Sequence, residues 1–292
     1  MRYRVSHRTR YTYDADVTDS LGVAYVVPRE LPWQRVSDAV VEVDPGPSDV
    51  SRSLDHYGNH VTYFQVTEPH RRLDVVGRSV VDVEAPVVEG AALQQPWESL
   101  RPLVHPELDD AWHVTDLALE SPLVEHVDAA HAYAEPSLRP GRPVGEAVLD
   151  LVHRVHADVA YEPGATTVTS TIADVLRDRA GVCQDFAQLM LACLRSHGLA
   201  ARYVSGYLAT DPPPGMPRLV GADASHAWVS VWLGGGTWLA VDPTNDQVVD
   251  DRYVTVAWGR DYGDVPPLKG VILTDATSSS LDVEVDVAPE PA

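Results

Sequence analysis

Cysteine, histidine and aspartate follow one another in three short blocks in the second half of the chain. The blocks are GVCQDF at 181–186, SHAWV at 225–229 and VDPTN at 241–245. A cysteine nucleophile needs a base that holds it as a thiolate and later protonates the leaving group. That base in turn needs a carboxylate or an amide that fixes its tautomer and orientation. Cys183, His226 and Asp242 are therefore candidates for these three catalytic roles.

The first candidate, Cys183, opens a predicted helix. Apolar residues recur from Phe186 onward at the spacing of one helix face, and His197-Gly198 is typical of a helix end. The pattern is apolar nearly all round, which predicts a central helix. At its first turn, unpaired backbone N–H groups and the helix dipole favour a thiolate. We interpret the second cysteine, Cys193, as a small hydrophobic residue of the same helix.

Strand alternation can place the other two candidates side by side. His226 begins one predicted strand, Asp242 ends the next, and the glycines at 234–236 lie between the strands. If these three glycines are the loop, Trp232 lies opposite Trp238, and Asp242 becomes the diagonal same-face neighbour of His226. A two-residue loop would put Asp242 on the wrong face. We expect the cysteine helix to pack across the face that carries His226.

The remaining chain predicts an α+β fold. Residues 1–88 are expected to form an antiparallel β-sandwich-like domain, because 3–13 alternate strictly and turn residues recur at regular intervals. Further strands of this domain are predicted near 21–27, 35–43, 60–67 and 73–84. The arginine-rich face of the first strand is interpreted as a solvated outer surface rather than an anion site.

Residues 89–143 are rich in proline and predict a linker with short helices such as 109–119 and 123–133. A helix-plus-antiparallel-sheet catalytic domain is expected over 144–287, and 288–292 is interpreted as a disordered tail. Its helices are predicted at 144–155, 171–179 and 183–197, and its strands at 200–209, 225–233, 237–242, 252–258 and 281–287.

Three more blocks accompany the first three: YEPG at 161–164, ARYVSGY at 201–207 and GRDYGDVPP at 259–267. Together the blocks resemble the transglutaminase-like superfamily of papain-like cysteine enzymes, in its bacterial branch with an N-terminal β-domain. The resemblance implies Cys183 as nucleophile, His226 as general base and acid, and Asp242 as the group that orients His226. It also implies acyl transfer through a thioester, either to an amine or to water.

The groups around the nucleophile are less defined. The backbone N–H of Cys183 is the natural first donor of an oxyanion hole. Tyr161, an upstream aromatic residue, and Gln184 are two alternatives for the second donor. Trp228 is a candidate for the wall of a substrate groove.

No metal or other cofactor is expected. No loop resembles a calcium site, and the histidine pair at 153 and 156 lacks the further ligands that zinc requires.

Composition limits the partners. The 43 acidic residues against 22 basic ones give a net charge of −21, which argues against nucleic acid and an anionic membrane surface as partners. The two cysteines lie ~15 Å apart along one helix, too far for a disulfide, and free thiols suit a reducing cytoplasm. No secretory signal and no membrane-length apolar run is visible. The expected partner is a protein or peptide substrate, with a primary amine as one of the two acceptors.

Two other functions stay open. A small-molecule acyltransferase of the arylamine type would use the same three residues, and a binding module could retain the fold without turnover. The sequence does not indicate the oligomeric state or the natural substrate.

Overall fold

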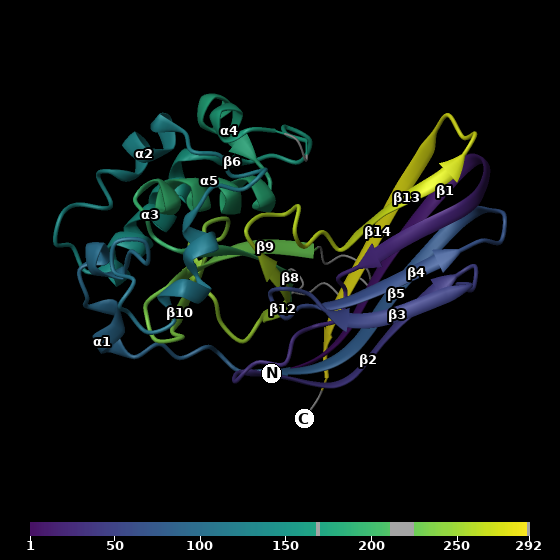
Figure 1. Cartoon of the computed structure of the whole chain (residues 1–292), viewed down its shortest axis with the longest axis horizontal. Helices are drawn as coiled ribbons and strands as arrows, with labels where there is room; N and C mark the ends of the chain where they lie inside the picture. Colours follow the sequence, from purple (N-terminus) through teal and green to yellow (C-terminus); the bar gives the residue numbers. More distant parts are fainter. Residues whose placement is uncertain (168–169, 211–224, 291–292) are drawn as a thin grey trace, which may run out of the picture.

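The computed structural model of the protein describes residues 1–167, 170–210 and 225–290. The predicted α+β class is confirmed. A long antiparallel sheet curls along one side of the molecule, and the helices lie on the other side together with a second antiparallel sheet (Figure 1). The two ends of the chain lie close together, because the N–H of Glu290 donates a hydrogen bond to the carbonyl of Arg2.

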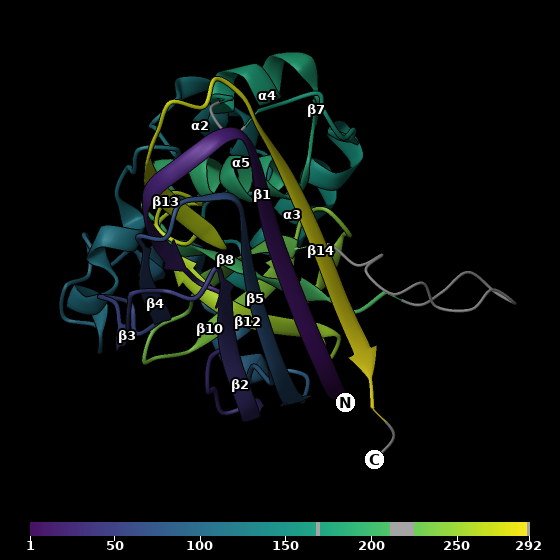
Figure 2. The same ribbon diagram turned by 90° about the vertical axis from the view of Figure 1, so that its right-hand side faces the viewer.

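The first sheet is built around β1 (Arg2–Ala24). The two halves of β1 pair with β5 (His70–Val83) and β4 (His60–Val66) on one side, and with β14 (Ser279–Pro289) and β13 (Leu268–Thr274) on the other. Outside β5 and β4 lie β2 (Gln34–Asp44) and β3 (Asp49–Leu54), which form one edge of the sheet, while β13 and β14 form the other. Figure 2 shows β14, β1 and β5 running side by side. The predicted antiparallel β-domain is thus one curled sheet, and the strands predicted at 3–13 and 21–27 are continuous.

The predicted domain boundaries differ from this arrangement at the C-terminal end. The strand predicted at 281–287 as part of the catalytic domain is β14, which pairs along β1 from Tyr3–Pro289 to Tyr13–Ser279. The predicted tail at 288–292 begins inside this strand, and 291–292 lie outside the described residues. Alternation identifies a strand locally, but its sheet is decided by a partner more than 250 residues away in sequence.

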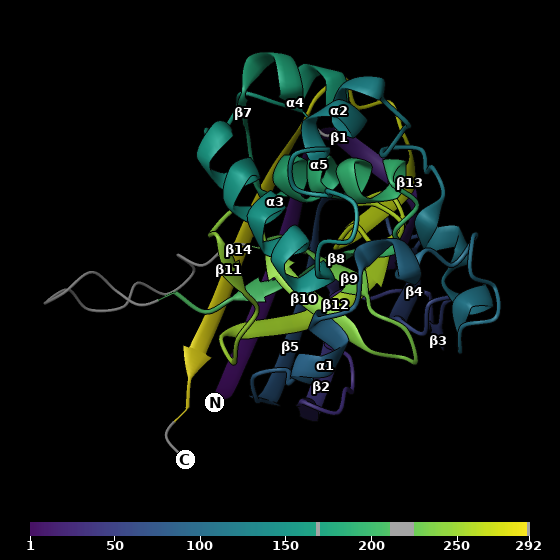
Figure 3. The ribbon, with the colours of Figure 1, turned by 90° about the vertical axis from the view of Figure 1, so that its left-hand side faces the viewer.

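The cysteine helix, α5 (Cys183–Ser196), is central as predicted. It packs against α2 (Asp128–Ala134), α3 (Val144–Asp158) and α4 (Ile172–Asp178), and against strands of the second sheet (Figures 1 and 3). Its residues Leu189, Met190 and Leu191 are fully buried. Because α2 packs on α5, the helical core begins before the expected domain start at 144.

The second sheet has the strand order β11-β10-β9-β8-β12. Its strands are β8 (Ala201–Leu208), β9 (Ser225–Trp232), β10 (Trp238–Asp242), β11 (Gln247–Val248) and β12 (Tyr253–Gly259). The predicted three-glycine loop is confirmed: Trp232 pairs with Trp238, and Leu233 donates its N–H to the carbonyl of Thr237. All three loop glycines have positive φ, which only glycine adopts readily.

The connecting stretch at 89–143 is mostly irregular. It contains α1 (Gly90–Leu93) and 3-10 turns at Trp97–Leu100, Ala111–His113 and Thr115–Ala118. The helix predicted at 109–119 is replaced by two such turns; Asp110, before the first, is left-handed, and Val114, between them, has a non-helical backbone with φ −113° and ψ 3°. Among the helices of the described ranges, none is both long and apolar enough to cross a lipid bilayer.

Candidate active site

Cys183 is the first residue of α5, and its thiol is partly exposed. The turn that leads into the helix is closed by Asp185, whose Oδ2 accepts the Val182 N–H at 2.7 Å and the Thr166 hydroxyl at 2.6 Å. Gly181 makes this turn possible, because a Cβ at that position would lie 2.7 Å from the Asp185 Cβ. The local sequence therefore fixes the helix end that carries the thiol.

His226 connects this thiol to Asp242. The Nε2 atom of His226 lies 2.7 Å from Asp242 Oδ2, which leaves Nδ1 available to Cys183, and both side chains line the same cleft. Burial alone lowers the pKa of His226, but the hydrogen bonds with Asp242 and Cys183 outweigh burial and raise this pKa to about 10. The imidazole is therefore protonated at neutral pH.

Asp242 is fully buried and held by several donors. Its Oδ2 accepts hydrogen bonds from the Tyr253 hydroxyl and the Asn245 side chain, each at 2.7 Å, while Oδ1 accepts the Thr244 N–H at 2.8 Å. Burial by itself raises the pKa of Asp242, but the bonds from His226, Asn245 and Tyr253 lower it overall. The carboxylate stays charged despite its burial.

Helix α5 packs on the face of the second sheet opposite to the one that we expected. The β9 residues that share the main hydrophobic cluster with α5 are Ala227, Val229 and Val231. His226 alternates with these residues and points away from that cluster. It still reaches Cys183 because it stands at the start of β9, and the thiol stands at the start of α5.

The two helix α3 histidines that we considered as metal ligands hold the segment after Asp242. His153 Nδ1 lies 2.8 Å from Asp246 Oδ2, and His156 Nδ1 lies 2.9 Å from the Thr244 carbonyl oxygen. Within the described part of the chain, no group of three or more His, Cys, Asp or Glu side chains could hold a metal ion.

The thiol opens into a cleft of about 270 Å³ between the two sheets. Gln184, Tyr203 and Tyr262 line it from the side of α5 and the second sheet. His7, Thr9 and Tyr11 of β1 line it from the side of the first sheet. The N-terminal sheet is therefore one wall of the candidate active site.

The predicted neighbours of the thiol have different positions. Gln184 lines the cleft. Tyr161 pairs with Gly181 in the short parallel ladder of β6 (Ala160–Tyr161) and β7 (Ala180–Gly181), close to the thiol, but it is 57% exposed and does not line the cleft. The role of either residue in an oxyanion hole stays a prediction.

Trp228 is not a wall of the groove. It is 1% exposed, and its ring packs edge-on against Tyr253 with centroids 5.3 Å apart. The ring lies over Gly206 of β8, where a Cβ would be 2.5 Å from Trp228 Cη2. Because Gly206 has no side chain, the Trp228 indole packs against the sheet and does not face a substrate.

Several residues at the site were not predicted. Asn245 and Tyr262 belong to the VDPTN and GRDYGDVPP blocks, which are the available signals for them. For Tyr253, the only sequence signal was the pattern of a predicted strand. Alternation along β1 showed that its residues share a face, but not which part of the molecule that face contacts.

A thiol at a helix start, an imidazole and a buried carboxylate, set beside an antiparallel sheet, define a core of the transglutaminase type. The chain belongs to the transglutaminase-like superfamily. The sequence model of this family matches residues 130–243, the range that contains Cys183, His226 and Asp242. Residues 3–82 match the bacterial transglutaminase-like N-terminal region.

The chain is similar to bacterial proteins over nearly its full length. An uncharacterized protein of Mycobacterium tuberculosis is 50% identical over 296 residues, which cover 99% of this chain and 93% of the relative. A protein-glutamine gamma-glutamyltransferase of Pseudomonas aeruginosa is 36% identical over 131 residues, covering 38% of this chain and 20% of that enzyme. A candidate cysteine protease of Cytophaga hutchinsonii has the same fold, with a TM-score of 0.75 and 21% identity, over 98% of this chain and 90% of that one.

Proposed function

We propose that this protein is a cysteine enzyme that takes an acyl group from the carboxamide of a glutamine in a polypeptide. The observation that carries the proposal is the set of side chains at one cleft: Cys183 and His226 both line it, and His226 Nε2 lies 2.7 Å from the buried Asp242 carboxylate. The glutamyltransferase name of the Pseudomonas aeruginosa relative supports glutamine as the donor.

The proposed reaction has two halves. The Cys183 thiolate attacks the carboxamide carbon, and the tetrahedral intermediate expels ammonia after His226 Nδ1 gives it a proton. A primary amine or water then attacks the thioester. The attacking group loses a proton to Nδ1, which restores the imidazolium, and the bond between the Cys183 sulfur and the acyl carbon breaks. Asp242 holds Nε2–H throughout, so that Nδ1 keeps facing the sulfur.

A glutamine-containing peptide, incubated with and without a biotinylated primary amine, tests the proposal. We expect ammonia release with the wild type and with Cys193→Ala, and none with Cys183→Ala. Amine incorporation would identify a transferase, and ammonia release without incorporation an amidase. Cleavage of the peptide backbone, or no product from the wild type, would contradict glutamine as the donor.

Acetyl donors and arylamine acceptors provide the comparison with a small-molecule acyltransferase. Turnover of these compounds, with none of the peptide, would replace the proposed function by that alternative.

A further inference from the structure

The wall that the first sheet gives to the cleft is apolar and partly exposed. On β1 and β14, Thr9 pairs with Val283 and Tyr11 with Leu281, and all four residues line the cleft. Leu281 is 56% exposed and Val283 is 47% exposed. The next residues on the same face of β14, Val285 and Val287, are buried in the main core. The exposed pair thus marks the place where the sheet leaves the body of the molecule.

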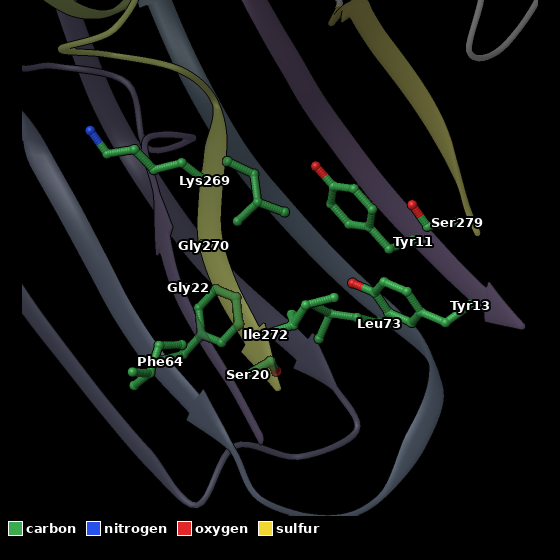
Figure 4. Close-up of a pocket in the computed structure, with 12 residues that line it drawn as sticks. Tyr11, Tyr13, Ser20, Gly22, Phe64, Leu73, Lys269, Gly270, Ile272 and Ser279 are labelled. Carbon is green, nitrogen blue, oxygen red and sulfur yellow. The ribbon is translucent and has the colours of Figure 1, made fainter. Parts of the chain in front are cut away.

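A second depression, of about 160 Å³, lies farther along the same sheet (Figure 4). We name it the trough; its apolar lining includes Tyr13, Phe64, Leu73 and Ile272. The Phe64 ring lies over Gly22, where a Cβ would be 2.1 Å from the ring. This glycine leaves room for the ring to lie against the sheet and form the floor.

The trough and the cleft adjoin each other. Tyr11 and Leu268 line both of them. Tyr11 stacks on Tyr13 with ring centroids 6.1 Å apart and planes 6° from parallel, so the two phenols form a continuous side wall (Figure 4). A depression that begins at the thiol therefore continues along the first sheet.

Apart from Cys183 and His226 at the reactive end, the described lining of the cleft and the trough has one charged side chain, a lysine. The chain has 43 acidic residues, yet none of the described side chains that line the cleft or the trough is a carboxylate. The charged residue is Lys269, whose Nζ donates a hydrogen bond to the Gly263 carbonyl oxygen at 3.2 Å. An apolar lining within a strongly acidic protein selects for apolar groups of a ligand.

We infer that the first sheet selects the acyl donor: an apolar side chain of the donor polypeptide occupies the trough while its glutamine lies at Cys183. The inference rests on the proposed function. The occupant is a polypeptide because one extended chain can fill the cleft and the adjoining trough at once. The trough lies to one side of the thiol, so the apolar residue must stand on one particular side of the glutamine.

Peptides that carry a chloroacetamide group in place of the glutamine carboxamide test this inference. A phenylalanine is placed two to five residues before or after the reactive group, and the reference peptide has serine there. The measurement is the second-order rate of Cys183 labelling, followed by mass spectrometry. We expect about a tenfold faster rate with phenylalanine on one side only, the effect of burying one such side chain.

Two neighbouring residues of β13 give a matched pair of variants. Ile272→Glu puts a charge in the trough and should remove the advantage of phenylalanine. Leu273→Glu should keep it, because Leu273 is 68% exposed and lines neither depression. An unchanged advantage in Ile272→Glu, or no advantage at any position in the wild type, would overturn the inference.

Iodoacetamide separates this result from the proposed function. It is too small to reach the trough from the thiol, so both variants should be labelled at the wild-type rate. Slow labelling of the wild-type Cys183 by iodoacetamide would count against the proposed thiolate, whatever the peptides show. If free N-acetyl-phenylalanine amide speeds labelling by the serine peptide equally, the trough is an independent small-molecule site, and the inference is overturned.

Discussion

The Nε2 atom of His226 lies 2.7 Å from Oδ2 of Asp242, and the carboxylate has no exposed surface. A buried carboxylate is costly unless it is fully hydrogen-bonded. Tyr253, at the start of β12, and Asn245, in the turn between β10 and β11, complete its bonds. The pair is therefore held rigidly, which suits a histidine that must keep one nitrogen toward a thiol.

The raised pKa of His226 predicts the alkaline limit of activity. The imidazolium supplies the proton that the departing ammonia needs, and its pKa of about 10 means that this proton is lost as the pH rises through about 10. The rate at subsaturating peptide should fall there. In Asp242→Asn the alkaline limit should move toward 6.5, the ordinary pKa, because the carboxylate no longer stabilises the cation. We also expect a rate loss on the order of 10² to 10⁴. An unchanged limit would mean that another group controls it.

Tyr253→Phe should weaken turnover with little effect on peptide binding. The change removes the hydroxyl that donates to Asp242 at 2.7 Å but keeps the ring that packs on Trp228. We expect kcat to fall about threefold to tenfold, the equivalent of losing about 1 kcal/mol, with KM nearly constant. Tyr133→Phe is the matched control, because its hydroxyl donates to Asp158 away from the site. Equal losses in both variants would indicate general destabilisation.

Labelling with iodoacetamide should distinguish the two cysteines. Burial raises the pKa of Cys193 to about 12, so this thiol stays protonated and inaccessible at neutral pH. Cys183 is partly exposed and lines the same cleft as a protonated imidazole, so it should be labelled first by a wide margin. His226→Gln should slow the labelling of Cys183 and leave Cys193 unlabelled. Equal slow labelling of both thiols in the wild type would contradict a thiolate at Cys183.

Short-range patterns predicted the site better than the arrangement of the domains. The His226–Asp242 contact follows from alternation and one three-glycine loop, which act over 16 residues. The position of β14 beside β1 depends on a pairing across almost the whole chain, which no local pattern encodes. Alternation also assigned Trp228 correctly to the face of His226, but it cannot tell whether a face meets a substrate or another part of the fold.

Gly181→Ala should disturb the start of α5. The added Cβ would lie 2.7 Å from the Asp185 Cβ, so Asp185 must move from the turn that it closes. We expect a loss of about 1 to 3 kcal/mol in the free energy of unfolding, together with slower labelling of Cys183. Gly90→Ala, in open space at the start of α1, is the control for a change of glycine alone. Urea unfolding and iodoacetamide labelling measure the two effects, and wild-type values for both would show that the turn tolerates a side chain.

His7, in the part of the first sheet that lines the cleft, should make the free energy of unfolding sensitive to acid. The residue is buried between Tyr207, 3.0 Å from Nδ1, and Thr9, 3.1 Å from Nε2, and burial lowers its pKa from 6.5 to about 4. The unfolded chain therefore takes up this proton first as the pH falls below 6.5. The free energy of unfolding should decrease between about pH 6.5 and pH 4, by up to about 3 kcal/mol from this residue. His7→Gln cannot bind the proton, so its urea midpoint should change less than that of the wild type between pH 7.5 and pH 5. Parallel changes in the two proteins would assign the acid sensitivity to other groups.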